Sequence, residues 1–115
     1  MATATVVTTS LLAALFVFAG SIKVLGVRQS LAIRDHLGIS ATLWRVIGLL
    51  ELAGVVGVLA GLAWTPLGIA AAVGLALLSV GAVASHVRAT DGAGQSVPAV
   101  IGLILAVATA VLHIV

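Results

Sequence analysis

The sequence predicts an all-α integral membrane protein folded as a four-helix bundle. Of its 115 residues, 63% are hydrophobic and only 7% are charged, whereas about a quarter of the residues of a soluble domain are charged. Its uncharged stretches are also about as long as the roughly 20 apolar residues that a helix needs to cross a bilayer. Four such spans with short connections fill the chain, so we expect a single transmembrane domain over residues 1–115.

The first predicted span covers residues 3–25 and carries one charged side chain, Lys23, near its end. A cleavable signal peptide has basic residues at its start. No charged residue precedes Lys23, so we expect this segment to remain as a helix. The polar connector 26–40 follows, and it is compatible either with a short interfacial helix that ends at Gly38 or with an irregular loop.

The second predicted span covers residues 41–62 and begins after Ser40. The Ser40 hydroxyl can cap that helix by accepting a hydrogen bond from a backbone N–H of the first turn. Trp64 and Pro66 mark the break before the third span, residues 66–87. An indole suits the interface between lipid and water, and proline fits the first turn of a helix.

Residues 88–96 contain two glycines and an aspartate, which predicts a turn. Pro98 is expected to open the fourth span, residues 97–114. The four spans then alternate in direction, and the connectors 26–40 and 88–96 lie on the same side of the membrane.

Glycine is abundant, with 13 residues, most of them inside the predicted spans. Small residues let transmembrane helices approach closely. We expect this use at Gly54, Gly57 and Gly61 of the second span and at Gly74 and Gly81 of the third. Packing within one chain is the simpler interpretation, and a seam between two copies of the chain, giving a homo-oligomer, is the alternative.

The positive charges predict the orientation in the cell membrane. All five Lys and Arg residues lie in or beside connectors 26–40 and 88–96. By the positive-inside rule these connectors are cytoplasmic and both termini face outward. The same charges are too few and too dispersed for a nucleic-acid-binding surface, so we interpret them as topology signals.

The absence of cysteine excludes disulfides, thiolate catalysis and cysteine-ligated metals. The three histidines lie on separate elements and do not have the spacing of a metal site. We therefore expect no metal centre, and any redox chemistry must come from a bound molecule or a partner.

Glu51 is the most informative polar residue. It lies ten residues, or about 15 Å, into the second span, close to the middle of a hydrocarbon core about 30 Å thick. An acidic side chain there costs about 3 kcal/mol on insertion scales and is expected to face the bundle interior, with a partner or protonated. Its role is either functional or the structural one of fixing helix register.

Three basic or titratable side chains lie on the half of the membrane toward which Glu51 can point: Lys23, Arg45 and His86. Lys23 could instead be a snorkelling anchor, Arg45 a positive-inside determinant, and His86 a structural residue. Together with Glu51 they form a candidate ligand-binding or acid–base site. The same residues could also simply hold the bundle together.

Three segments resemble the DoxX-like family of small four-helix membrane proteins: FAGSIK, WRVIGLLELAGVVGVLAGL and TPLGIAAAVGLALLSVGAVASHVRATD. The resemblance covers nearly the whole chain. The matching positions are those that end the first span, precede Glu51 and end the third span: Ala19, Gly20, Lys23, Ile47, Gly48, Glu51, Gly81, Ala82, His86 and Arg88.

The family is named for a subunit of a thiosulfate:quinone oxidoreductase, and other members resemble membrane partners of redox proteins. The resemblance implies an accessory subunit of a membrane redox system that binds a quinone-like or other lipophilic molecule and associates with a redox partner protein. One alternative is a small membrane enzyme, an isomerase or an epoxide-opening enzyme, that uses Glu51 and His86 as acid and base. Another is a structural or chaperone-like bundle.

Overall fold

The computed structural model describes residues 2–115, apart from the side chain of Ala93, and within that range it contains five helices. Four of them are long and apolar enough to cross a membrane, and the remaining one is short. The helices are α1 Thr3–Val24, α2 Arg28–Leu37, α3 Ala41–Ala60, α4 Thr65–Arg88 and α5 Ala93–Ile114. The prediction of an all-α bundle with four membrane-spanning helices is confirmed.

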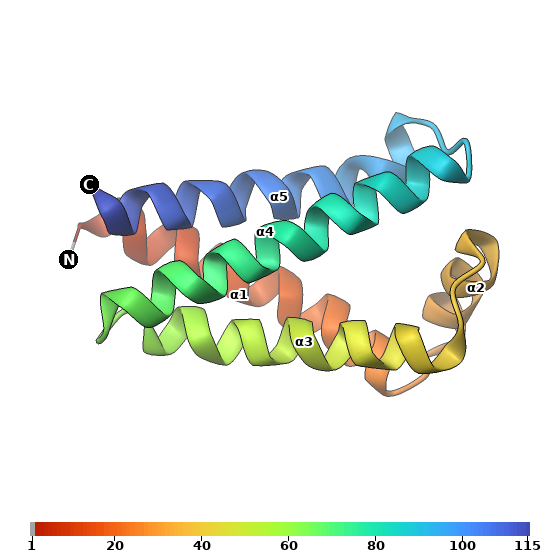
Figure 1. The fold of residues 1–115 in the computed structure, drawn as a ribbon, viewed down its shortest axis with the longest axis horizontal. Coiled ribbons are helices and arrows are strands. Elements are labelled where there is room, and N and C mark those ends of the chain that lie inside the picture. The colour runs from red at the N-terminus through yellow and green to blue at the C-terminus, as the bar shows by residue number, and fades with distance from the viewer. Residues whose placement is uncertain (1) are drawn as a thin grey trace.

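The four long helices run up and down in chain order (Figure 1). Helix α1 packs against α3 and α5, and α4 packs against the same two helices, so the four form a closed ring. The bundle is 41 Å long, about the thickness of a bilayer with its headgroup regions. Both termini lie at one end of the bundle, and α2 lies at the other end, between the diverging ends of α3 and α4 (Figure 1).

Helix ends follow the expected local chemistry at most positions. Ser40 caps α3, with its hydroxyl oxygen accepting a hydrogen bond from the Leu43 N–H at 3.1 Å. Pro66 is in the first turn of α4, where a missing N–H leaves no carbonyl without a donor. The connector after α1 contains a helix rather than an irregular loop. Gly38 ends that helix with φ 70°, a conformation that glycine adopts without strain.

The start of the fourth span differs from the expectation. Helix α5 begins at Ala93, so Pro98 lies inside it instead of opening it. In the turn before the proline, the Gly92 carbonyl accepts from the Ser96 N–H at 3.4 Å and from the Ser96 hydroxyl at 3.2 Å. Pro98 cannot donate to the Gly94 carbonyl, but Gly94 is exposed near the end of the bundle, where water can take that place.

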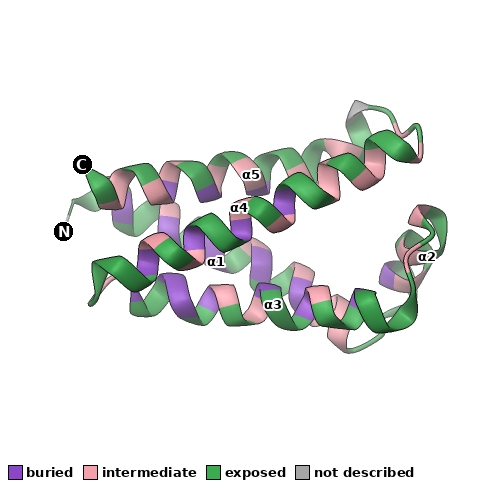
Figure 2. Ribbon diagram, in the orientation of Figure 1, coloured by how far each residue is buried: buried purple, intermediate pink, exposed green. Residues whose placement is uncertain are grey.

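Buried residues lie along all four long helices, toward the inside of the bundle (Figure 2). Its centre consists of buried side chains from all four long helices: Leu12, Ala13, Phe16, Val55, Val58, Ala72, Leu75 and Ala106. Gly54 and Gly57 of α3, and Gly61 directly after it, lie against α4, as expected: a Cβ at Gly57 would stand 2.6 Å from the Ala71 Cβ. Gly74 and Gly81 do not serve this purpose, because they are exposed on the outer face of α4 and a Cβ there would have nothing within 4 Å.

Candidate functional site

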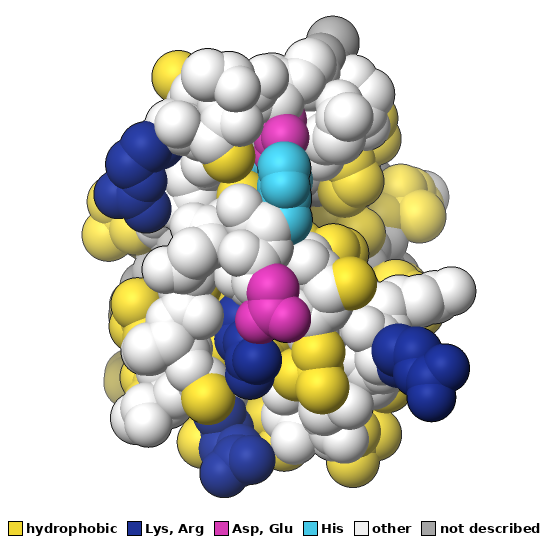
Figure 3. Space-filling model, turned by 90° about the vertical axis from the view of Figure 1, so that its right-hand side faces the viewer, with side chains coloured by type: hydrophobic (Ala, Val, Ile, Leu, Met, Phe, Trp, Pro, Cys, Tyr) yellow, Lys and Arg dark blue, Asp and Glu magenta, His cyan; other side chains and the backbone are white. Residues whose placement is uncertain are grey.

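The charged side chains lie on the half of the bundle that carries α2, away from the termini. Viewed from that end, basic, acidic and histidine side chains share one face (Figure 3). The eight charged residues are Lys23, Arg28, Arg34, Asp35, Arg45, Glu51, Arg88 and Asp91. This asymmetry puts the candidate chemistry of the molecule at one end of an otherwise apolar bundle.

Lys23 of α1 and Glu51 of α3 form an ion pair inside the bundle. The Lys23 Nζ lies 2.9 Å from Glu51 Oε1, and the two side chains are only 14% and 7% exposed. Two glycines bring the helices together beside this pair: a Cβ at Gly20 would stand 2.9 Å from the Gly48 carbonyl oxygen. The pair therefore depends on a close helix approach that larger residues would prevent.

The hydrogen bonding of the pair is incomplete. Among the described residues, Glu51 Oε1 has no hydrogen-bond donor in a favourable direction, although the Lys23 ammonium is at ion-pair distance. Lys23 also donates to the Ala19 carbonyl at 3.3 Å. An ammonium group has three donors and a carboxylate has about four acceptor positions, so the contacts of the pair leave a donor of Lys23 and acceptor positions of Glu51 for a further polar group.

Trp44 covers the pair from the side of α2. Its ring centroid lies 5.0 Å from the Lys23 Nζ, within the range of a cation–π contact. The Trp44 Nε1–H donates to the hydroxyl of Ser30 at 2.9 Å, and Ser30 is fully buried. A continuous series of contacts therefore runs from α2 through Trp44 to Lys23 and Glu51.

A second cluster ties α2 to the connection between α4 and α5. Asp91 is shared by two imidazoles: His36 Nε2 lies 2.5 Å from its Oδ1, and His86 Nδ1 lies 2.6 Å from its Oδ2. The Asp91 side chain is 5% exposed. Its hydrogen bonds with His36 and His86 hold the pKa of Asp91 below its usual range, against the opposing effect of desolvation.

The structure divides the four residues predicted as one site. Lys23 and Glu51 come together. Arg45 is exposed on α3 and, among the described residues, makes no ion pair. His86 joins Asp91 and not Glu51.

Sequence reasoning missed Ser30, His36 and Asp91, which lie in or next to connectors. The sequence does indicate that Trp44 lies near Glu51, because it precedes Glu51 by seven residues and so lies on the same helix face. His36 and His86, although on separate helices, meet at one carboxylate. His113 lies at the other end of the bundle, against Gly68 of α4.

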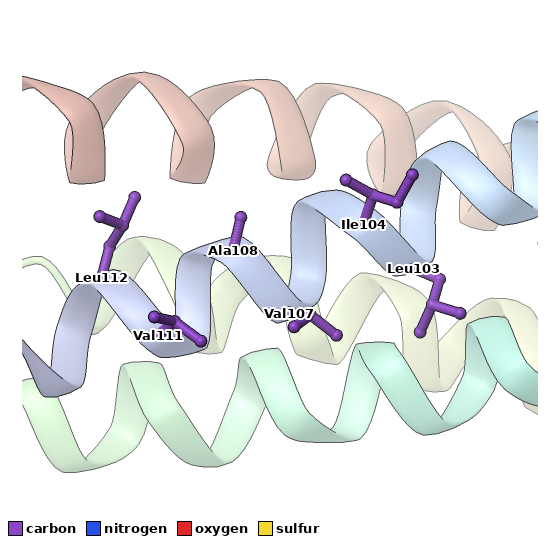
Figure 4. Close-up of a pocket in the computed structure, with 6 residues that line it drawn as sticks. All are labelled: Leu103, Ile104, Val107, Ala108, Val111 and Leu112. Atoms are coloured by element: carbon purple, nitrogen blue, oxygen red, sulfur yellow. The ribbon is translucent and has the colours of Figure 1, made fainter.

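Two apolar hollows lie on the outside of the bundle. One, of about 560 Å³, lies along α5, with Ile104 and Ala108 on the side of α1 and Val107 on the side of α4 (Figure 4). The other, of about 370 Å³, runs between α3 and α4 past Gly54, one turn from Glu51. Neither is lined by a charged residue.

Four apolar helices, an apolar core and charge confined to one half define a small four-helix membrane protein. Comparison with known families gives the same answer: a sequence model of the DoxX-like family matches residues 7–109. The chain therefore belongs to the DoxX-like family. Comparisons with curated proteins and with solved structures find no significant match.

Proposed function

We propose that this protein is an accessory subunit of a membrane redox system and that the Lys23–Glu51 pair binds the polar head of a lipophilic molecule of the quinone type. The observation that carries the proposal is the incomplete hydrogen bonding of a buried ion pair. Intramembrane ionisable groups are rare and are a functional-site hypothesis by default. Glu51 is buried with Lys23 as its ion-pair partner, and a carboxylate has more acceptor positions than one ammonium fills, so a hydroxyl group could donate to it.

The residues present suit a quinone head. The Lys23 ammonium can donate to a carbonyl oxygen, and the Glu51 carboxylate can accept from the hydroxyl of the reduced form. A bound quinone would carry electrons, which no side chain of this cysteine-free chain supplies. Lys23 and Glu51 would hold and orient the head, and the redox partner protein would provide the electrons.

An apolar surface for the tail lies close by. The hollow between α3 and α4 begins near Leu50 and Gly54, which flank Glu51 along α3, and continues to Gly57. A lipophilic chain in this hollow would bury apolar area between α3 and α4, from the level of Glu51 toward the end that carries the termini, at about 25 cal/mol per Å². The proposed ligand is therefore a molecule with a small polar head and an apolar tail.

The proposal also includes the orientation of the bundle in the membrane. Three exposed arginines, Arg28, Arg45 and Arg88, surround the end that carries α2. The positive-inside rule places this end in the cytoplasm and both termini outside. A cytoplasmic redox partner would then meet the end of the bundle that carries α2, the end nearer to Lys23.

The arrangement gives less support to an acid–base enzyme that uses Glu51 and His86 together. Glu51 is paired with Lys23, and His86 with Asp91. A purely structural bundle accounts for the ion pair but does not account for its free hydrogen-bonding capacity.

Binding of decylubiquinone in nanodiscs tests the proposal. Trp64 is 62% exposed, and replacing it by Trp64→Phe leaves Trp44, beside the pair, as the only tryptophan. We expect decylubiquinone to quench Trp44, and Glu51→Gln or Lys23→Met to weaken binding about tenfold or more, because a hydrogen bond to a charged group is lost.

Arg45→Gln is the matched control, since it removes an exposed charge from the same helix as Glu51. In the Trp64→Phe background it should bind decylubiquinone as tightly as Trp64→Phe alone, which serves as the parent protein. Equal binding by the parent, Glu51→Gln and Lys23→Met, with circular dichroism showing that all are folded, would overturn the proposal.

A further inference from the structure

We propose that α2 is a lid over the Lys23–Glu51 pair, that the His36–Asp91–His86 cluster fastens it, and that it loosens as the imidazoles lose their protons. The lid itself is inferred from contacts that involve no ligand. Only the molecule whose access it would control rests on the function proposed above.

Helix α2 is flanked by two backbone positions that can act as hinges. Gly26 precedes it with φ 67° and Gly38 follows it with φ 70°. Glycine enters this left-handed region without strain, and the two residues have open space where a Cβ would lie. The helix between them can therefore change its angle to the bundle without steric conflict at Gly26 or Gly38.

The first fastening lies near the start of α2. Ser30 accepts a hydrogen bond from Trp44, whose ring lies over Lys23. Ser30 is fully buried and Trp44 is 6% exposed, so closure of α2 shields the ring that covers the ion pair. Displacing α2 would expose the Trp44 ring first and then Lys23.

The second fastening lies at the other end of α2. His36, its penultimate residue, contacts Asp91, which follows α4 and also contacts His86. Apart from these contacts, α2 has only small packing interfaces with the bundle, the main one being with α1. The cluster therefore bridges α2 to a helix pair on which it hardly packs.

The neighbouring charged groups have other partners or are exposed. On α2, Arg34 pairs with Asp35 at 2.9 Å, and Arg28 is exposed. On the helices beside it, Lys23 of α1 pairs with Glu51, while Arg45 of α3 and Arg88 of α4 are exposed. Among the described residues, only His36 and His86 shift the ionisation of Asp91.

The sign of the pH response follows from the charges. Imidazole side chains ordinarily change charge between about pH 5 and pH 8. When they are protonated, their hydrogen bonds to the Asp91 carboxylate are charge-assisted, and such bonds are roughly twice as strong as neutral ones. The lid is therefore tightest when the imidazoles are protonated and loosens when they lose their protons.

Quenching of Trp44 by acrylamide, a neutral water-soluble quencher, tests the lid without any ligand. The full chain carrying Trp64→Phe is placed in nanodiscs, so that Trp44 is the only tryptophan. We expect the quenching constant of this parent to rise severalfold from about pH 5.5 to about pH 8.5. With Asp91→Asn it should be high at both pH values, and His36→Gln should behave in the same way.

Asp35→Asn is the matched control, because it removes an exposed acid from α2 that takes no part in the cluster. It should follow the parent at both pH values. The lid is refuted if Asp91→Asn and His36→Gln, shown to be folded by circular dichroism, quench like the parent. If the lid opens as expected but decylubiquinone binding does not depend on Glu51, the proposed function fails and the lid stands.

Discussion

Gly48 of α3 lies so close to Lys23 of α1 that a Cβ at Gly48 would stand 2.8 Å from the Lys23 Cβ. This contact sets how deeply Lys23 can reach toward Glu51. The ion pair and the close approach of the two helices are therefore parts of one arrangement, and each can be tested separately.

Gly48→Ala should separate α1 from α3 and lower stability. Besides the Lys23 Cβ, the added methyl would meet the Gly20 carbonyl oxygen and a Val24 methyl at 3.0 Å. Overpacking of this kind typically costs about 1–3 kcal/mol. Unfolding in mixed micelles measures the change, and Gly74→Ala is the control because its methyl would enter open space. Equal stability of the two variants would contradict the packing described here.

Lys23→Met should destabilise the bundle by about 3 kcal/mol, because it leaves the Glu51 carboxylate buried without its partner. The double variant Lys23→Met/Glu51→Leu should cost less than Lys23→Met alone, since an apolar pair needs no counter-ion. The same unfolding measurement checks this non-additivity. The comparison also needs the single variant Glu51→Leu. If the stability losses of Lys23→Met and Glu51→Leu add up to the loss of the double variant, the two residues do not act as a pair.

Strong acid should also release α2, because it protonates the Asp91 carboxylate. The pKa of Asp91 is lowered in the folded protein by His36 and His86. Its stabilising contribution is therefore complete above the usual carboxyl range, near about pH 4, and is lost as the pH falls through the lowered value. Quenching of Trp44 in the Trp64→Phe background should rise below about pH 4 in the parent, and Asp91→Asn should lack this step. A step of the same size in Asp91→Asn would assign it to another group.

Much of the fold could be predicted from the sequence. Charge-free stretches predicted the four long helices, and Ser40, Gly38 and Pro66 predicted helix ends because their effects are local. The inward faces were harder to predict. A helix between lipid and an apolar core is apolar all round, so the sequence pattern did not reveal that Gly54 faces α4 while Gly74 faces outward.

The candidate site could be predicted only in part. An acid deep in a span must find a partner, which pointed to Lys23. The contacts of His36 with Asp91 and of Ser30 with Trp44 depend on where α2 lies across the end of the bundle. That position is set by tertiary structure and by the hinges at Gly26 and Gly38, so no spacing in the sequence reports it.

The charge distribution predicts that a tag added after Val115 is reachable only from outside the cell. All five basic residues lie toward the opposite end of the bundle, with α2. Labelling of intact and permeabilised cells with an impermeant reagent measures this. Labelling only after permeabilisation would reverse the orientation and place the Lys23–Glu51 end outside.

Native mass spectrometry of the purified protein, followed by lipid extraction, tests the central claim most directly, because it shows whether a lipophilic molecule depends on the Lys23–Glu51 pair. We predict that the parent and Arg45→Gln retain one bound molecule with a small polar head and an apolar tail, and that Glu51→Gln and Lys23→Met lose it. Retention of the same molecule by all four proteins, or its absence from the parent, would contradict the account.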